Sequence, residues 1–155
     1  MIHAALFDVV TTLPVSIIAD HLGGLQGVSK LPPHLANDGV LSQTGFASLL
    51  TLAKQSKVIV KISGLYRASN RTTSCFDDTR PIIEAFAREI PDQCIWGSDW
   101  PHTGEGSNRT KQGGLATKEP FRVIDDQALL EKVREWVGSE VWEKMMRENP
   151  ARIFQ

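Results

Sequence analysis

The chain has 155 residues, of which 41% are hydrophobic and 23% are charged, so its composition is that of one ordinary globular domain. These values exclude a disordered chain, a collagen and a coiled coil. The 17 Lys and Arg residues nearly balance the 18 Asp and Glu residues, which leaves a formal net charge of −1. Because no net positive field is available to collect phosphates, we expect no nucleic-acid partner.

The apolar runs are short, and none approaches the ~18 residues that a membrane-spanning helix needs. We therefore expect no membrane partner. Residues 1–19 contain no Lys or Arg and are interrupted by His3 and Asp8, so they do not resemble a secretory signal. Two cysteines, Cys75 and Cys94, make no disulfide framework. These observations together predict a cytoplasmic protein with reduced thiols.

Three short apolar runs rich in β-branched residues predict strands at residues 15–19, 57–62 and 93–96. Apolar residues at helical spacing predict helices before, between and after these strands, at residues 4–10, 44–56, 79–90, 129–137, 139–146 and 149–154. Gly138 separates the fourth predicted helix from the fifth. Strands that alternate with helices in this way are typical of parallel βαβ units in an α/β protein. The remaining sequence forms long loops, at residues 64–77 and 101–123, after the second and third strands.

Polar side chains follow each predicted strand directly. They are Asp20 and His21 after the first strand, Ser63, Tyr66 and Arg67 after the second, and Ser98, Asp99 and His102 after the third. The carboxyl ends of parallel strands meet at the same edge of a sheet, where ligands bind in such folds. We therefore expect these side chains to share one site for a small-molecule substrate.

Asp99 is the strongest candidate for a general base. It comes directly after an apolar run and precedes Trp100, so partial burial is expected to raise its pKa toward the range of a base. His102 offers a hydrogen bond to a substrate oxygen, or a metal-ligand set together with His21 and Asp99. Arg67 carries a forked donor that suits a substrate carboxylate.

Four segments resemble motifs of one enzyme family: residues 17–24 (IIADHLGG), 60–67 (VKISGLYR), 95–102 (IWGSDWPH) and 148–154 (ENPARIF). On these motifs the chain resembles the amidohydrolase-related metal-dependent hydrolases, and within them the 2-pyrone-4,6-dicarboxylate lactonase group. The resemblance implies a TIM (β/α)8 barrel, of which the three strands here are similar to the last three. The fold expected from it is therefore an α/β partial TIM barrel that forms a single domain over residues 1–155.

The same resemblance implies roles for individual residues. Asp99 resembles the acid after the family's last strand that activates water, and His21 resembles a histidine that lines the site. Arg67 and His102 resemble substrate-binding groups, and Tyr66 and Ser63 belong to the same substrate-binding motif.

The lactonase group works without a tightly bound metal, whereas many of its relatives use zinc or manganese. The cofactor therefore stays open between a divalent ion held by His21 and Asp99 and no metal at all.

The chain departs from the family pattern in two ways. The family has a His-x-His pair after its first strand, and no two of the four histidines here have that spacing. Three strands also cannot close a barrel, so two sheet edges would lack partners. We expect a truncated chain, in preference to a fragment or a chain that completes itself by self-association through those edges.

The activity expected by resemblance is hydrolysis of a lactone or cyclic amide of a small carboxylate, with Asp99 assisting the attack of water. In its truncated form the chain is expected to be inactive. Two alternatives stay open: a metal-dependent decarboxylase of the same superfamily, which a metal requirement would favour, and a non-catalytic barrel remnant, which the missing His-x-His pair favours.

Overall fold

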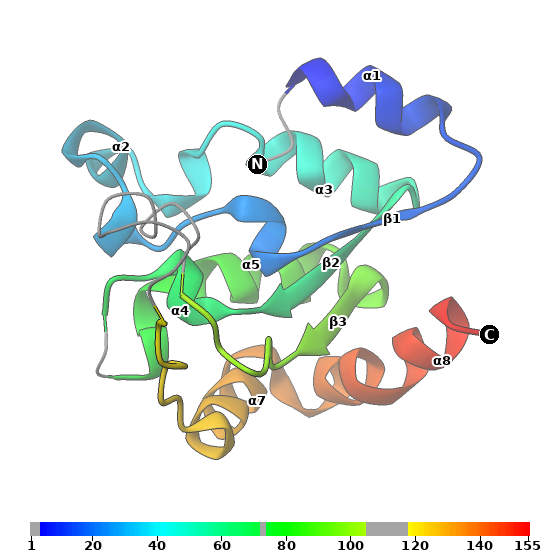
Figure 1. Cartoon of the computed structure of the whole chain (residues 1–155). Helices are drawn as coiled ribbons and strands as arrows, with labels where there is room; N and C mark the ends of the chain where they lie inside the picture. The colour runs from blue at the N-terminus through cyan, green and yellow to red at the C-terminus, as the bar shows by residue number, and fades with distance from the viewer. Residues whose placement is uncertain (1–3, 72–73, 105–117) are drawn as a thin grey trace.

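A three-stranded parallel sheet forms the centre of the molecule (Figure 1). The computed structural model describes residues 4–71, 74–104 and 118–155. The strands are β1 (Ile17–Ala19), β2 (Val58–Ser63) and β3 (Cys94–Gly97), and they lie side by side in the order β1-β2-β3. Ile18 pairs with Ile59, and Lys61 pairs with Ile95. The predicted α/β class and the predicted parallel strands are confirmed.

Helices precede, connect and follow the strands. They are α1 (Ala4–Thr12), α2 (Pro33–Asn37), α3 (Phe46–Lys54), α4 (Leu65–Ala68), α5 (Arg80–Glu89), α7 (Asp126–Glu143) and α8 (Asn149–Ile153). Short 3-10 turns lie at His21–Gly24, Val28–Lys30, Val40–Ser42, Ser74–Thr79 and Pro91–Gln93, and a π-helical turn lies at Lys144–Glu148. Gly138 interrupts α7 with φ 77°, where the sequence predicts a break. No helix in the described part of the chain is long and apolar enough to cross a membrane.

The long loops are more ordered than the sequence predicts. The loop after β2 contains α4 and a 3-10 turn, and the segment after β1 contains α2. These elements are single turns or little more, too short for the helical periodicity of apolar residues to reveal them. Residues 72–73 and 105–117 of the two predicted loops lie outside the described residues.

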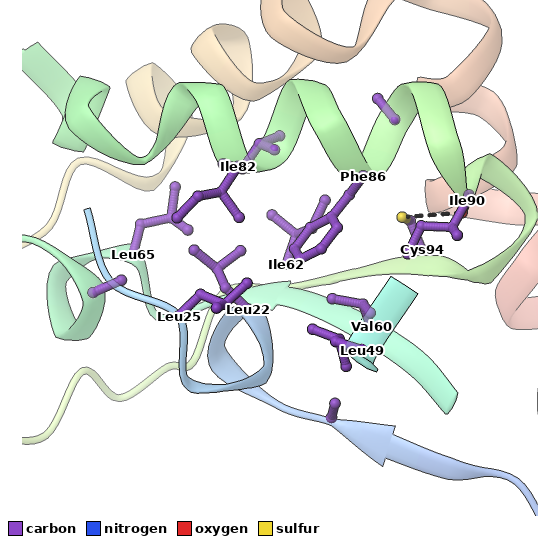
Figure 2. Packing of buried hydrophobic residues seen from close by; sticks show 14 of the residues in the cluster. Leu22, Leu25, Leu49, Val60, Ile62, Leu65, Ile82, Phe86, Ile90 and Cys94 are labelled. Carbon is purple, nitrogen blue, oxygen red and sulfur yellow. Dashed lines mark hydrogen bonds between the residues drawn. The ribbon is translucent and has the colours of Figure 1, made fainter. Parts of the chain in front are cut away.

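The hydrophobic core lies on one face of the sheet, against α3, α5 and α7. Val58, Val60 and Ile62 alternate along β2 and are fully buried there. Figure 2 shows Ile82 and Phe86 of α5 pointing toward Ile62. Full burial of each such side chain contributes ~1.5–3 kcal/mol, so this face holds the strands firmly in register.

The opposite face of the sheet changes character along β2. Ile59 is buried near the amino end of the strand, Lys61 lies half-buried next to it, and Ser63 is fully buried at the carboxyl end. On β3, Gly97 leaves room for the stem of Lys61, because a Cβ at this position would lie 3.2 Å from Lys61 Cδ. The polar part of this face therefore begins at Lys61 and leads to the ends of the strands, where the candidate site lies.

Candidate active site at the carboxyl end of the sheet

The carboxylate of Asp99 is held by two donors from the segment after β2. Tyr66 Oη and Arg67 Nε each donate a hydrogen bond of 2.6 Å to Asp99 Oδ2. Arg67 Nη2 also donates to Thr103 Oγ1 at 2.9 Å, which fixes the guanidinium in place. Because both contacts with Asp99 end on Oδ2, Oδ1 is the carboxylate oxygen that can accept a hydrogen bond from a water or a substrate.

The expectation of a raised pKa for Asp99 is wrong. Burial raises the pKa of this carboxyl, but the hydrogen bonds from Tyr66 and Arg67 and the charge of Arg67 outweigh burial, and the pKa lies below its usual value. Burial and the Asp99 carboxylate together raise the pKa of Tyr66 to about 12. Asp99 is therefore an ionised acceptor at neutral pH, and Tyr66 keeps its proton.

His21 forms a second cluster with Asp20 and Ser63. His21 Nδ1 lies 3.1 Å from Ser63 Oγ, and the backbone N of His21 donates to Asp20 Oδ1 at 2.8 Å. The Ser63 hydroxyl donates to the same Oδ1. Lys61 Nζ pairs with Asp20 Oδ2 at 2.9 Å, so a partly exposed chain of polar contacts runs from the middle of β2 to the His21 ring.

Gly64 brings the two clusters together. A Cβ at Gly64 would lie 2.7 Å from His21 Nδ1 and 2.9 Å from Asp99 Oδ2, and φ at this residue is 53°. Only glycine combines this backbone conformation with so close an approach of two side chains. The structure thus places His21, Asp99 and Arg67 around one point, as the arrangement of the strand ends predicts.

Four residues other than glycine in this region have left-handed backbone conformations: His21 (φ 50°), Leu22 (φ 57°), Asp99 (φ 64°) and His102 (φ 54°). Positive φ values are uncommon outside glycine and cost about 1–3 kcal/mol each where the conformation is sparsely populated. Such strain gathers at functional sites, where the surrounding structure holds a side chain in a required direction. Ser56, Cys75 and Phe76 have the same conformation elsewhere in the chain, so the polar contacts, and not the backbone strain alone, identify the site.

His102 contacts a different set of groups from His21. Its Nε2 lies 3.0 Å from Asp126 Oδ2 at the start of α7, and its ring edge packs on the ring of Tyr66 with centroids 5.7 Å apart. The side chain is buried, and its contact with Asp99 is a backbone hydrogen bond from His102 N to Asp99 O. In this arrangement His102 supports Tyr66, which in turn holds Asp99.

The donor set does not form a metal site by itself. Among residues 4–71, 74–104 and 118–155, no group of three His, Cys, Asp or Glu side chains could hold an ion. Of the three candidate ligands, Asp99 is paired through Oδ2 with the Arg67 cation, and His102 Nε2 lies against Asp126 instead of facing His21. The described residues therefore do not fit zinc or manganese on their own, and we derive no chemical step through a metal.

Sequence patterns missed several groups of this site. Arg122 lies 5.2 Å from the Tyr66 ring centroid, and Arg67 lies 5.0 Å from the same centroid. Lys61 supports Asp20 from the middle of β2. A cation within an otherwise apolar strand is a signal that could have identified Lys61, whereas nothing local distinguishes Arg122 or Asp126. The substrate-binding roles of Arg67, His102, Tyr66 and Ser63 stay predictions.

Comparison with known proteins places the chain among larger enzymes. The sequence model of the family Amidohydrolase matches residues 1–155. A 4-sulfomuconolactone hydrolase from Rhizobium radiobacter is 31% identical over 153 residues, which are 96% of this chain and 42% of that protein. The chain thus spans less than half the length of this relative.

Two solved structures share the fold. The structure of a putative 2-pyrone-4,6-dicarboxylic acid hydrolase from Pseudomonas putida aligns with a TM-score of 0.66 and 24% identity, covering 97% of this chain and 46% of that one. An amidohydrolase from Burkholderia multivorans with bound zinc aligns with a TM-score of 0.62 and 17% identity, covering 96% and 47%. A three-stranded parallel arc that matches less than half of each larger chain is the partial TIM barrel expected from the sequence.

Proposed function

Because the chain belongs to the amidohydrolase family, we propose that it forms the carboxyl-terminal part of a hydrolase that opens a lactone or a cyclic amide bearing a carboxylate. The observation that carries this proposal is the ionised Asp99 carboxylate, held by Tyr66 and Arg67 beside His21. The names of its relatives support the substrate class, since sulfomuconolactone and pyrone dicarboxylate are both anionic lactones.

In the proposed reaction, Asp99 Oδ1 accepts a proton from a water molecule while the water oxygen bonds to the carbonyl carbon of the ring. The bond between that carbon and the ring oxygen, or the ring nitrogen of a cyclic amide, then breaks, and the departing atom takes up the proton that Asp99 accepted. The product is an open hydroxy acid or amino acid. Asp99 in its ionised form is ready to orient water at neutral pH. Its low pKa makes it a weak base, so proton transfer becomes favourable as the water acquires positive charge during attack.

The cations around Tyr66 supply the binding of the anionic substrate. Arg67 uses Nε for Asp99 and Nη2 for Thr103, so the other terminal nitrogen, Nη1, can bind a substrate carboxylate. Arg122 lies near the same ring and is exposed. Because Asp99 already balances the charge of Arg67, Arg122 supplies the net positive charge that favours an anionic substrate, as in the relatives' names.

The rest of the site would come from the part of the relatives that this sequence does not match, since it spans 42% of the Rhizobium radiobacter relative. Positioning of a substrate contributes large factors in rate, so we expect no detectable hydrolysis by the 155-residue chain alone.

A chimera tests the proposed function. It joins the amino-terminal part of the Rhizobium radiobacter relative to this chain and is assayed on anionic lactones and on their uncharged esters. The proposal expects hydrolysis of the anionic lactones by the chimera and none by the chain alone. If a cooperatively folded chimera hydrolyses no lactone or cyclic amide, the proposal is wrong; if it prefers the uncharged esters, the role of the two arginines is wrong.

A further inference from the structure

The Ser63 hydroxyl lies buried between His21 and Asp20, and its hydrogen bonds can be counted completely. A hydroxyl has one hydrogen to donate and two lone pairs to accept with. Ser63 Oγ donates to Asp20 Oδ1 and accepts from the backbone N of His21 at 3.2 Å. One lone pair is left, and the group that faces it at 3.1 Å is His21 Nδ1.

Asp20 determines the direction of the Ser63 hydrogen. Its Oδ2 pairs with Lys61 Nζ at 2.9 Å, and its Oδ1 accepts from the backbone N of His21. Burial raises the pKa of Asp20, but the hydrogen bonds from Ser63 and Lys61 outweigh burial, and the pKa lies below its usual value. Asp20 is thus a carboxylate that can only accept hydrogen bonds, and the single hydrogen of Ser63 points to it.

His21 Nδ1 therefore faces two acceptors. One is Ser63 Oγ, and the other is Asp20 Oδ1 at 3.4 Å. A lone pair on Nδ1 would repel both oxygens, whereas a hydrogen on Nδ1 satisfies the remaining lone pair of Ser63. In a neutral imidazole the hydrogen bond made by one nitrogen decides which nitrogen carries the proton. The hydrogen is accordingly on Nδ1, and Nε2 carries the lone pair.

We infer that Ser63, Asp20 and Lys61 are positioning residues that hold His21 in the Nδ1–H tautomer, so that its Nε2 lone pair is the group offered to the substrate. Gly64 completes the arrangement, because no Cβ fits between its backbone and the His21 ring. That the group facing Nε2 is the substrate rests on the proposed function. In this tautomer neutral His21 accepts a proton or a hydrogen bond at Nε2, from an N–H or O–H of the substrate or from the attacking water, and cannot donate one there.

Nitrogen NMR of the full chain tests the inference without substrate. The chain is labelled with 15N-histidine and measured at about pH 8.5, well above the ordinary histidine pKa of ~6.5. His21→Gln identifies the His21 signals among the four histidines. We expect a protonated Nδ1 and an unprotonated Nε2, with the Nδ1–H form in at least about tenfold excess, because the other tautomer would leave the Nδ1 lone pair facing the Ser63 oxygen with no hydrogen between them. A wild-type spectrum in which Nε2–H predominates overturns the inference.

Two variants test whether Asp20 and Ser63 set the tautomer of His21 or only support the fold. Asp20→Asn removes the charge that orients Ser63, so the Nδ1–H excess should fall at least about threefold. Ser63→Ala leaves Asp20 Oδ1 as the nearest acceptor, at 3.4 Å, and should lower the excess by a smaller factor. Ser69→Ala is the matched control, since Ser69 is a buried serine that donates to a different acid, Asp78, and should leave the His21 signals unchanged.

Thermal melts show which variants remain folded. If Asp20→Asn is unfolded, the wild-type tautomer and the Ser63→Ala spectrum still decide the question. A folded Asp20→Asn variant with the wild-type tautomer ratio overturns the role of Asp20. Failure of the chimera to hydrolyse lactones would not change these spectra, so the two proposals fail separately.

Discussion

The two faces of β2 differ in polarity: one is apolar throughout, and the other becomes polar toward the carboxyl end. Val58, Val60 and Ile62 are fully buried in the core, to which α3 also contributes. Figure 2 shows α5 packed against the sheet there. On the opposite face, Ile59, Lys61 and Ser63 alternate with them, and the character changes from apolar to polar toward the carboxyl end. One strand of six residues is thus both a packing element and the support of a site.

The second face is also less covered than the first at the amino end of the strands. Ile18 and Ile59 line a groove of about 500 Å³ with residues of the chain's last turn. Ile18 is 41% exposed and Phe154, which lies in the same groove, is 68% exposed. Stability is therefore expected to come mainly from the core face, and activity and association from the other face.

The largest expected effect lies on the polar part of the second face. In the chimera, Asp99→Asn keeps the size of the side chain and removes the base, so turnover should fall at least about a hundredfold. Asp92→Asn is a matched control at the other end of β3, where Asp92 is exposed and pairs with Lys144. Steady-state kinetics of the two variants give the comparison. Retention of most of the activity in Asp99→Asn would show that this acid has only a structural role.

The core face should dominate the free energy of unfolding. Ile62→Ala removes a fully buried side chain beside Phe86 and should cost about 2–5 kcal/mol. Ile18→Ala on the other face should cost less than about 1 kcal/mol, since Ile18 is 41% exposed. Urea unfolding of the chain measures both values. Equal losses would mean that the second face is as well packed in solution as the first.

The exposed side of the sheet should make the chain associate. Strand edges with unpaired backbone groups and apolar side chains favour pairing with other copies, so we expect oligomers or aggregates of the 155-residue chain. Ile18→Lys places a charge on the exposed part of β1 and should shift the population toward monomer. Sedimentation velocity measures this shift. A wild-type monomer with a sharp, cooperative melt would contradict the expectation.

The smallest expected effect is on stability in acid. The pKa values of Asp99 and Asp20 are lowered in the folded chain, so each carboxylate contributes stability that is fully present above its ordinary pKa. That contribution is lost as the pH falls from ~4 through the lower folded values. Urea midpoints from pH 5 to pH 3 should fall more steeply for the wild type than for Asp99→Asn. Parallel profiles would mean that Arg67 and Tyr66 do not stabilise the Asp99 carboxylate.

Local sequence signals located most of the fold. Each strand begins within two residues of its predicted start, because a short β-branched run carries its own signal. The stripe of Ile82, Ile83 and Phe86 located α5, and Gly138 marked the break in α7. The single turn α4 was missed, since four residues are too few to show a period.

The sequence by itself determined which residues stand at the ends of the strands, because these residues directly follow each strand along the chain. The tertiary structure alone decided how they behave. Asp99 is an ionised acid because Tyr66 and Arg67, more than 30 residues earlier in the chain, donate hydrogen bonds to it. Ser63 at the end of β2 donates to Asp20, which follows the neighbouring strand β1. Hydrogen-bond partners and pKa values depend on groups that only folding brings together, so neither follows from composition or spacing.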